Sequence, residues 1–290
     1  MACSDANPPE VLRRAFEPSG DFEPLPEPVF GDWLSIRPEP GQTFEQFVRS
    51  KPNRPDNRRD TLYLQPLGEF PPGDSPSLIR LKELAEAFFA MDVRVRPTLD
   101  LSEVPVAARQ NPGTGQRQLR TGDVIGFLQK RLPKDAFAML GVTMEDLYPG
   151  PEWNFVFGQA SLRGRVGIYS FARYDPQFYG EPRTGDWRKL MMKRSCKVLA
   201  HETVHMFGIP HCTAFRCLIN GSNSLEEADS RPLHLCPVDL RKLHRSIGFD
   251  VVERYRRLLE FSESEGFDDE ARWLRRRIDH ITGTGQGLLR

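Results

Sequence analysis

The chain has 290 residues, with 40 Lys or Arg and 40 Asp or Glu, so its formal net charge is zero. That length can bury a large core as one elaborated domain or as two closely packed subdomains. Balanced charge gives no field that would attract nucleic acid or an anionic membrane, and no run approaches the roughly 18 apolar residues of a membrane span. We therefore expect a globular monomer that binds neither nucleic acid nor membrane.

The cysteines and the N-terminal residues indicate the cellular compartment of the protein. The five cysteines are odd in number and three of them cluster at metal-binding spacing, which argues against a disulfide framework. Residues 1–10 contain no apolar stretch typical of a secretory signal. The sequence thus predicts a protein of the cytoplasm or nucleus that is not secreted.

Proline is dense near the N-terminus, where the first 76 residues hold 14 of the 25 prolines. This density favours an extended segment over residues 1–60 that wraps the rest of the protein, broken by a helix-compatible stretch at 43–50. Strands and helices then alternate. Strands are predicted at 62–67, 92–97 and 136–142, and helices at 77–91, from 121 to about 132, and at 187–207.

The second half of the chain continues this pattern. A hairpin is predicted over 158–174, and helices are predicted at 237–247, 251–261 and 271–281. The alternation indicates an α+β fold, with a twisted mixed sheet, a backing helix and a small, mainly helical C-terminal subdomain.

One motif predicts a metal site. Residues 201–211 read H-E-T-V-H-M-F-G-I-P-H, the pattern H-E-x-x-H-x-x-G-x-x-H. On a helix, residues four apart lie about 40° apart around the axis, so His201 and His205 face one ion. Gly208 permits the positive φ at which the chain leaves the helix and turns back, so that His211 becomes the third nitrogen ligand. Glu202 can reach a water bound to that ion.

The residues that follow narrow the family. His211 leads directly into Cys212, then Cys217 and Cys236, a spacing H-C-x4-C-x18-C. This resembles the archaemetzincins, metzincins that carry a catalytic three-histidine zinc and a second zinc held by four cysteines. The likeness covers residues 33 to 255 approximately, is closest to the animal-type members, and includes residues 144–149, 153–160, 167–174, 194–197 and 221–229.

The resemblance implies a metzincin, zincin-like fold and a zinc metallopeptidase. Residues 61–208 would form the upper catalytic subdomain with the active-site helix, and residues 209–290 the lower subdomain with His211, the cysteines and the C-terminal helices. In metzincins, a strand at the position that corresponds to residues 158–174 forms the edge of the sheet, and the peptide substrate pairs with it as an added strand. An ordinary covered hairpin is the alternative.

Two positions depart from the family pattern. Ile219 stands where the methionine of the Met-turn is expected, and its similar volume should preserve the apolar base under the histidines. Asp239 stands where the fourth cysteine is expected. A Cys3Asp site is chemically allowed but weaker, His234 is an alternative fourth ligand, and an empty site of reduced thiols is the remaining possibility.

The sequence therefore predicts an amino- or oligopeptidase with one catalytic and one structural Zn²⁺, in which Glu202 is the general base for a zinc-activated water. Slow turnover of generic peptides is expected, because Asn220 follows Ile219 where a tyrosine would stabilise the oxyanion. The alternative is a catalytically weak, zinc-stabilised peptide-binding protein.

Overall fold

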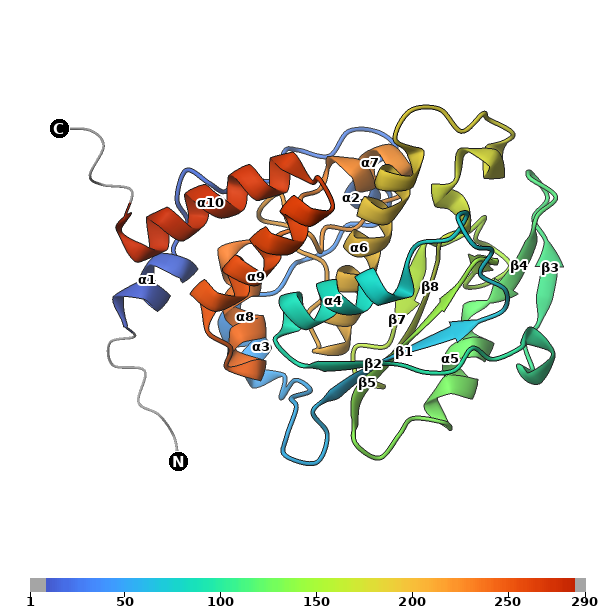
Figure 1. Ribbon diagram of the computed structural model, residues 1–290, viewed down its shortest axis with the longest axis horizontal. Helices are drawn as coiled ribbons and strands as arrows, with labels where there is room; N and C mark the ends of the chain where they lie inside the picture. The colour runs from blue at the N-terminus through green and yellow to red at the C-terminus, as the bar shows by residue number, and fades with distance from the viewer. Residues whose placement is uncertain (1–8, 285–290) are drawn as a thin grey trace.

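A mixed five-stranded sheet forms the frame of the structure, a computed structural model that describes residues 9–284 (Figure 1). Residues 1–8, which include Cys3 and most of the stretch on which the prediction about secretion rests, lie outside the described residues. The strand order is β2-β1-β5-β8-β7; all neighbours are parallel except the edge strand β7, which runs antiparallel to β8. The strands are β1 (Thr61–Leu67), β2 (Asp92–Val95), β5 (Ala136–Thr143), β7 (Gly158–Ala160) and β8 (Val166–Ser170).

Both faces of this sheet are buried, and the alternation along β1 shows why. Leu62 and Leu64 pack in the core shared with helices α4 (Leu78–Phe89) and α6 (Trp187–Met206). Tyr63 and Leu67 point the other way, into a second core with helix α5 (Thr121–Gln129). Successive strand residues face opposite sides, so a strand covered by helices on both faces is apolar throughout. The strands predicted at 62–67, 92–97 and 136–142 and the helix predicted at 187–207 are confirmed.

A second sheet of short strands was not predicted. It has the order β3-β4-β6, with β3 (Ala108–Gln110) antiparallel to β4 (Arg117–Arg120) and β4 parallel to β6 (Asp146–Tyr148). Strands of three or four residues with polar side chains carry too little periodicity to be recognised from sequence. Three 3-10 turns complete this half: η1 (Leu101–Glu103), η2 (Ala172–Tyr174) and η3 (Pro176–Tyr179).

Helices α8, α9 and α10 gather at the end of the molecule opposite the second sheet, whereas α7 lies near α6 (Figure 1). Helices α9 and α10 begin as predicted or three residues earlier, and each runs past its predicted end. None of the helices in the described residues has the length and apolar character to cross a membrane. The helices after α6 are α7 (Leu225–Ser230), α8 (Pro237–Ile247), α9 (Val251–Ser264) and α10 (Asp268–Thr282).

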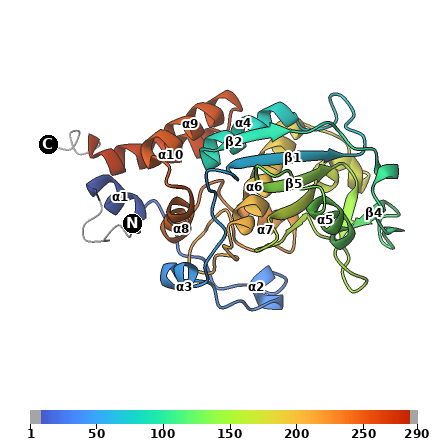
Figure 2. The ribbon, with the colours of Figure 1, turned by 90° about the horizontal axis from the view of Figure 1, so that it is seen from below.

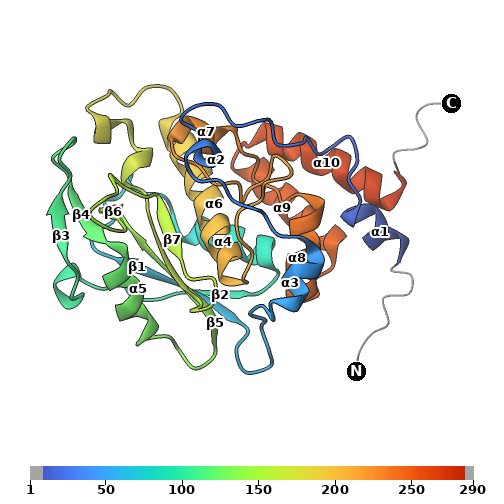
Figure 3. The same ribbon diagram turned by 180° about the vertical axis from the view of Figure 1, so that it is seen from behind.

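The N-terminal segment crosses the C-terminal half, as Figure 3 shows in blue, and α2 and α3 lie along one side of the molecule (Figure 2). It pairs with the chain after the three-histidine motif, where Leu25 N donates to Ala214 O and Arg216 N donates to Glu23 O. Only the third of its helices was predicted, because proline density masked the short first two. They are α1 (Glu10–Phe16), α2 (Trp33–Ile36) and α3 (Phe44–Arg49).

Candidate active site

Helix α6 and the turn after it bring the three motif histidines together. His201 and His205 lie on consecutive turns of α6, and the helix ends at Met206. Gly208 has a φ of 81°, and its N–H donates to His205 O at 2.8 Å, which closes the turn. His211 returns to the helix, so that one ligand nitrogen from each of the three rings lies within 4.8 Å of the others.

The outer ring nitrogens of the two helical histidines are bonded to main-chain carbonyls. His201 Nδ1 lies 3.0 Å from Leu218 O, and His205 Nδ1 lies 2.7 Å from Ile209 O. A carbonyl oxygen can only accept a hydrogen bond, so each Nδ1 carries the ring hydrogen. Each Nε2 then bears an unprotonated lone pair. The two Nε2 atoms face each other at 3.0 Å, a repulsive arrangement that a shared cation reverses. The donor set therefore fits zinc.

The third histidine is held by a carboxylate from the N-terminal segment. His211 Nδ1 lies 2.9 Å from Glu39 Oε1, and Trp33 Nε1 donates to the same oxygen at 2.6 Å. Burial opposes ionisation of Glu39, but these hydrogen bonds outweigh it and hold the pKa of Glu39 below its ordinary value. No local pattern in the sequence marked Glu39, because its partner lies 172 residues away.

Glu202 lies beside the three histidines and against the sheet edge. Its side chain is buried, at 5% exposure, and a Cβ atom on Gly158 of β7 would lie only 2.7 Å from its Oε1. Burial raises the pKa of Glu202 to about 8, and the nearby Arg231 guanidinium opposes that rise. A cation held by the three imidazoles would act in the same direction as Arg231.

Arg231 is a functional candidate that sequence reasoning missed. It is buried next to His201, with Nη1 3.3 Å from His201 Nδ1, and it donates to Asn220 O and to Ser222 Oγ. Its position after α7 is 30 residues from the histidine, so no spacing rule connects the two. Its contacts connect the turn at residues 217–222 to the first motif histidine, His201.

The cysteines form a second group with Asp239. Ligand atoms of Cys212, Cys217, Cys236 and Asp239 lie within 4.8 Å of one another, and all four residues are buried. Asp239 Oδ2 lies 3.2 Å from Cys236 Sγ, while Asp239 Oδ1 accepts from Lys242 Nζ at 2.8 Å. One carboxylate oxygen therefore faces the thiols and the other is held by a buried cation.

Burial makes ionisation of this group costly, and a bound cation would offset that cost. Hydrogen bonds from Cys217 and Cys236 hold the pKa of the Cys212 thiol below its ordinary value, while burial raises the pKa of both donors. Burial likewise raises the pKa of Asp239 to about 7. Sulfur and oxygen lone pairs that converge in an apolar interior are the donors that structural zinc uses.

His234 lies outside this group. Its ring stacks on Trp273 with centroids 3.5 Å apart, and its Nδ1 lies 3.4 Å from Glu270 Oε2. The structure thus brings Asp239, and not His234, to the three cysteines. Ile219 is fully buried, as an apolar base requires.

A cleft of about 460 Å³ opens over the histidines and Glu202. One wall is β7, the edge strand, and the others come from residues 149–157, helix α2 and the residues around Ser222. The predicted hairpin is confirmed, and its outer strand borders the cleft. An edge strand presents main-chain N–H and C=O groups that can pair with an extended peptide.

Comparison with known proteins agrees with this site. The model of Peptidase family M54 matches residues 129–245. Archaemetzincin-2 of Mus musculus is 39% identical over 91% of this chain and 82% of its own length, and that of Homo sapiens is 38% identical over 91% and 81%. A crystal structure of a zinc-dependent peptidase from Methanocorpusculum labreanum has a TM-score of 0.50 at 25% identity, over 63% of this chain and 99% of its own.

Fold, site and relatives together define a zinc metallopeptidase with a zincin-like fold. The chain belongs to the archaemetzincin family, peptidase family M54.

Gly158→Ala tests the contact between β7 and the carboxylate. The backbone of Gly158 is not left-handed, so alanine strains nothing locally, and the new Cβ displaces Glu202 instead. We expect peptide hydrolysis to fall about tenfold or more with zinc content unchanged, since the ligands do not move. Gly126→Ala is the control, because a Cβ there meets nothing within 4 Å. Equal activity of both variants would contradict the placement of Glu202.

Proposed function

We propose that this chain hydrolyses peptide bonds in the cleft, as an amino- or oligopeptidase, with Zn²⁺ at His201, His205 and His211 and with Glu202 as general base. The convergence of three imidazole lone pairs beside a buried carboxylate and a sheet edge supports this proposal most strongly. Zinc would lower the pKa of water toward about 7 and polarise the peptide carbonyl.

The residues of the chain supply the remaining steps. The edge of β7 holds the peptide main chain in extended form, antiparallel to the strand. Glu202 accepts the proton of the attacking water at a carboxylate oxygen and then donates it to the leaving amine. Burial of Glu202 keeps bulk water from competing for that proton.

Asn220 favours slow turnover of generic peptides. Its Oδ1 accepts from Cys217 N at 2.7 Å, and its Nδ2 donates to Cys212 O and Phe215 O. These bonds occupy the side-chain amide of Asn220 in shaping the turn. Asn220 therefore has no donor left for the substrate carbonyl oxygen as it gains negative charge. Glu202 counts against the alternative of a zinc-stabilised peptide-binding protein, since a purely structural three-histidine site has no use for that carboxylate.

We further infer a second, structural Zn²⁺ at Cys212, Cys217 and Cys236, with Asp239 as the fourth ligand. The contact of Asp239 Oδ2 with two of the thiols supports this assignment. Consistent with the expectations from sequence, we propose that the protein acts as a monomer in the cytoplasm or nucleus.

Glu202→Gln tests the base. The variant keeps all three ligands and the side-chain volume, so zinc should stay bound, while hydrolysis of a mixed peptide library falls by about 10² or more. Glu152→Gln is the matched control, because Glu152 is the other carboxylate that lines the cleft and is exposed. Turnover by Glu202→Gln equal to that of the unmodified chain would remove Glu202 from the mechanism.

The second site is tested by counting zinc before and after mild chelation. We expect two ions per chain, of which the ion of the cysteine site leaves first, because a carboxylate is a weaker zinc ligand than a thiolate. Its loss should lower activity, since Cys212 adjoins His211.

Asp239→Cys should tighten that ion and raise the melting temperature. The exchange removes the carboxylate that pairs with buried Lys242, which then keeps the carbonyl of Gln42 at 2.6 Å, while the new zinc-bound thiolate would keep a negative charge in the group. One tightly held zinc in both proteins, with unchanged melting, would show that the cysteines are plain core residues.

A further inference from the structure

Arg37 lines the cleft and packs against two tryptophans. Its guanidinium carbon lies 3.6 Å from the ring centroid of Trp153 and 5.5 Å from that of Trp33. All three residues line the same cleft as the zinc histidines and Glu202. Arg37 is exposed, yet stacking holds its head group in place.

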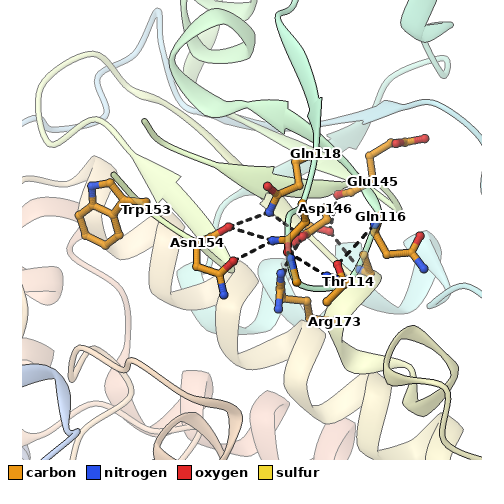
Figure 4. A network of polar contacts seen from close by, with 12 residues as sticks. Thr114, Gln116, Gln118, Glu145, Asp146, Trp153, Asn154 and Arg173 are labelled. Carbon is orange, nitrogen blue, oxygen red and sulfur yellow. Dashed lines mark hydrogen bonds and ion pairs between the residues drawn. The ribbon is translucent and has the colours of Figure 1, made fainter. Parts of the chain in front are cut away.

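A polar network fixes Trp153 on one side of the cleft (Figure 4). The carbonyl of the next residue, Asn154, accepts from Asn111 Nδ2 at 3.1 Å and from Gln118 Nε2 at 2.9 Å. Gln118 also donates to Asp146, which pairs with the buried Arg173. These residues lie on or beside the second sheet, and Figure 4 shows the indole of Trp153 pointing away from them.

Trp33 is fixed on the other side and is connected to the zinc site. Its main-chain N–H donates to Glu227 at 2.9 Å, and its indole N–H donates to Glu39, the carboxylate that holds His211. The indole packs so closely on Gly221 that a Cβ there would lie 2.2 Å from Trp33 Cδ1. The platform under Arg37 is therefore built from both walls of the cleft.

The stacked guanidinium is free to bind an anion. Stacking on the indole rings uses the flat faces of the guanidinium group. Its N–H groups lie in the guanidinium plane and stay available at the edge. Within residues 9–284, no hydrogen bond or ion pair joins this guanidinium to a carboxylate, although Glu152 lines the same cleft. A planar cation with a parallel pair of donors matches a carboxylate, which it binds through two hydrogen bonds.

We propose that Arg37, held by Trp33 and Trp153, binds a carboxylate of the peptide substrate and so makes the enzyme selective for peptides that carry one near the scissile bond. The carboxylate comes from an acidic side chain or from the C-terminus of the peptide. This inference rests on the proposed peptidase function. If Arg37 only anchors the N-terminal segment to residues 149–157, its replacement should instead change kcat/KM by the same factor for charged and neutral peptides.

The test compares matched peptides on the zinc-loaded chain. Each peptide of a mixed set is made with Glu or Gln at each position in turn, and with a free or amidated C-terminus. We expect about tenfold higher kcat/KM for the charged form at one position or at the C-terminus, which identifies the source. Arg37→Gln should abolish that preference, and Arg37→Lys should restore part of it, because lysine keeps the charge without the paired donors.

Arg241→Gln is the matched control, since Arg241 is also exposed and stacks on an aromatic ring, Phe44, at 3.9 Å, but lies outside the cleft. It should keep the preference for charged peptides. Equal kcat/KM for charged and neutral forms in the unmodified chain, or an unchanged preference in Arg37→Gln, would overturn the proposal.

Binding separates this proposal from the peptidase function. Affinities of the same peptides for zinc-loaded Glu202→Gln should show the same preference, again lost when Arg37→Gln is added. If that preference appears without hydrolysis by the unmodified chain, the carboxylate site stands and the peptidase function fails. If charged and neutral peptides bind equally, the carboxylate site fails whatever the turnover.

Discussion

Hydrogen bonds on the outer nitrogens of three histidines are the constraint on which the rest of the site depends. His201 and His205 each point Nδ1 at a main-chain carbonyl, and His211 points Nδ1 at Glu39. These bonds select the Nδ1–H tautomer and leave the Nε2 lone pairs facing one place. The fold holds three unprotonated Nε2 nitrogens close together although their lone pairs repel one another. A metal ion bound between them would replace this repulsion with attraction. The buried carboxylate of Glu202 then lies at the point where it can take a proton.

The N-terminal segment is part of this site and not an external covering. It supplies Glu39 as the hydrogen-bond partner of His211, and it supplies Trp33 and Arg37 to the cleft wall. One hydrogen-bonded chain runs from the indole of Trp33 through Glu39 to His211. Cleft-lining Trp33 is therefore joined by hydrogen bonds to His211, one of the three motif histidines. The second sheet has the complementary task of holding Trp153 on the opposite wall.

The helix and turn of the zinc motif were predictable, because their information is local: a four-residue spacing, a glycine with positive φ and a short return. Long-range contacts were not. Glu39 and Arg231 reach the histidines from 172 and 30 residues away, and no periodicity marks them. Spacing also could not predict which of Asp239 and His234 lies beside the three cysteines. The outcome depends on stacking of His234 on Trp273, a contact that only the folded chain creates.

The histidine tautomers test the central claim most directly. Nitrogen NMR of the zinc-loaded protein distinguishes a protonated ring nitrogen from one bound to metal. We expect His201, His205 and His211 each to carry hydrogen on Nδ1 and to bind metal through Nε2. A ligand ring with hydrogen on Nε2, or with Nδ1 on the metal, would contradict it, because the hydrogen bonds to Leu218, Ile209 and Glu39 would then not be the ones that organise the site.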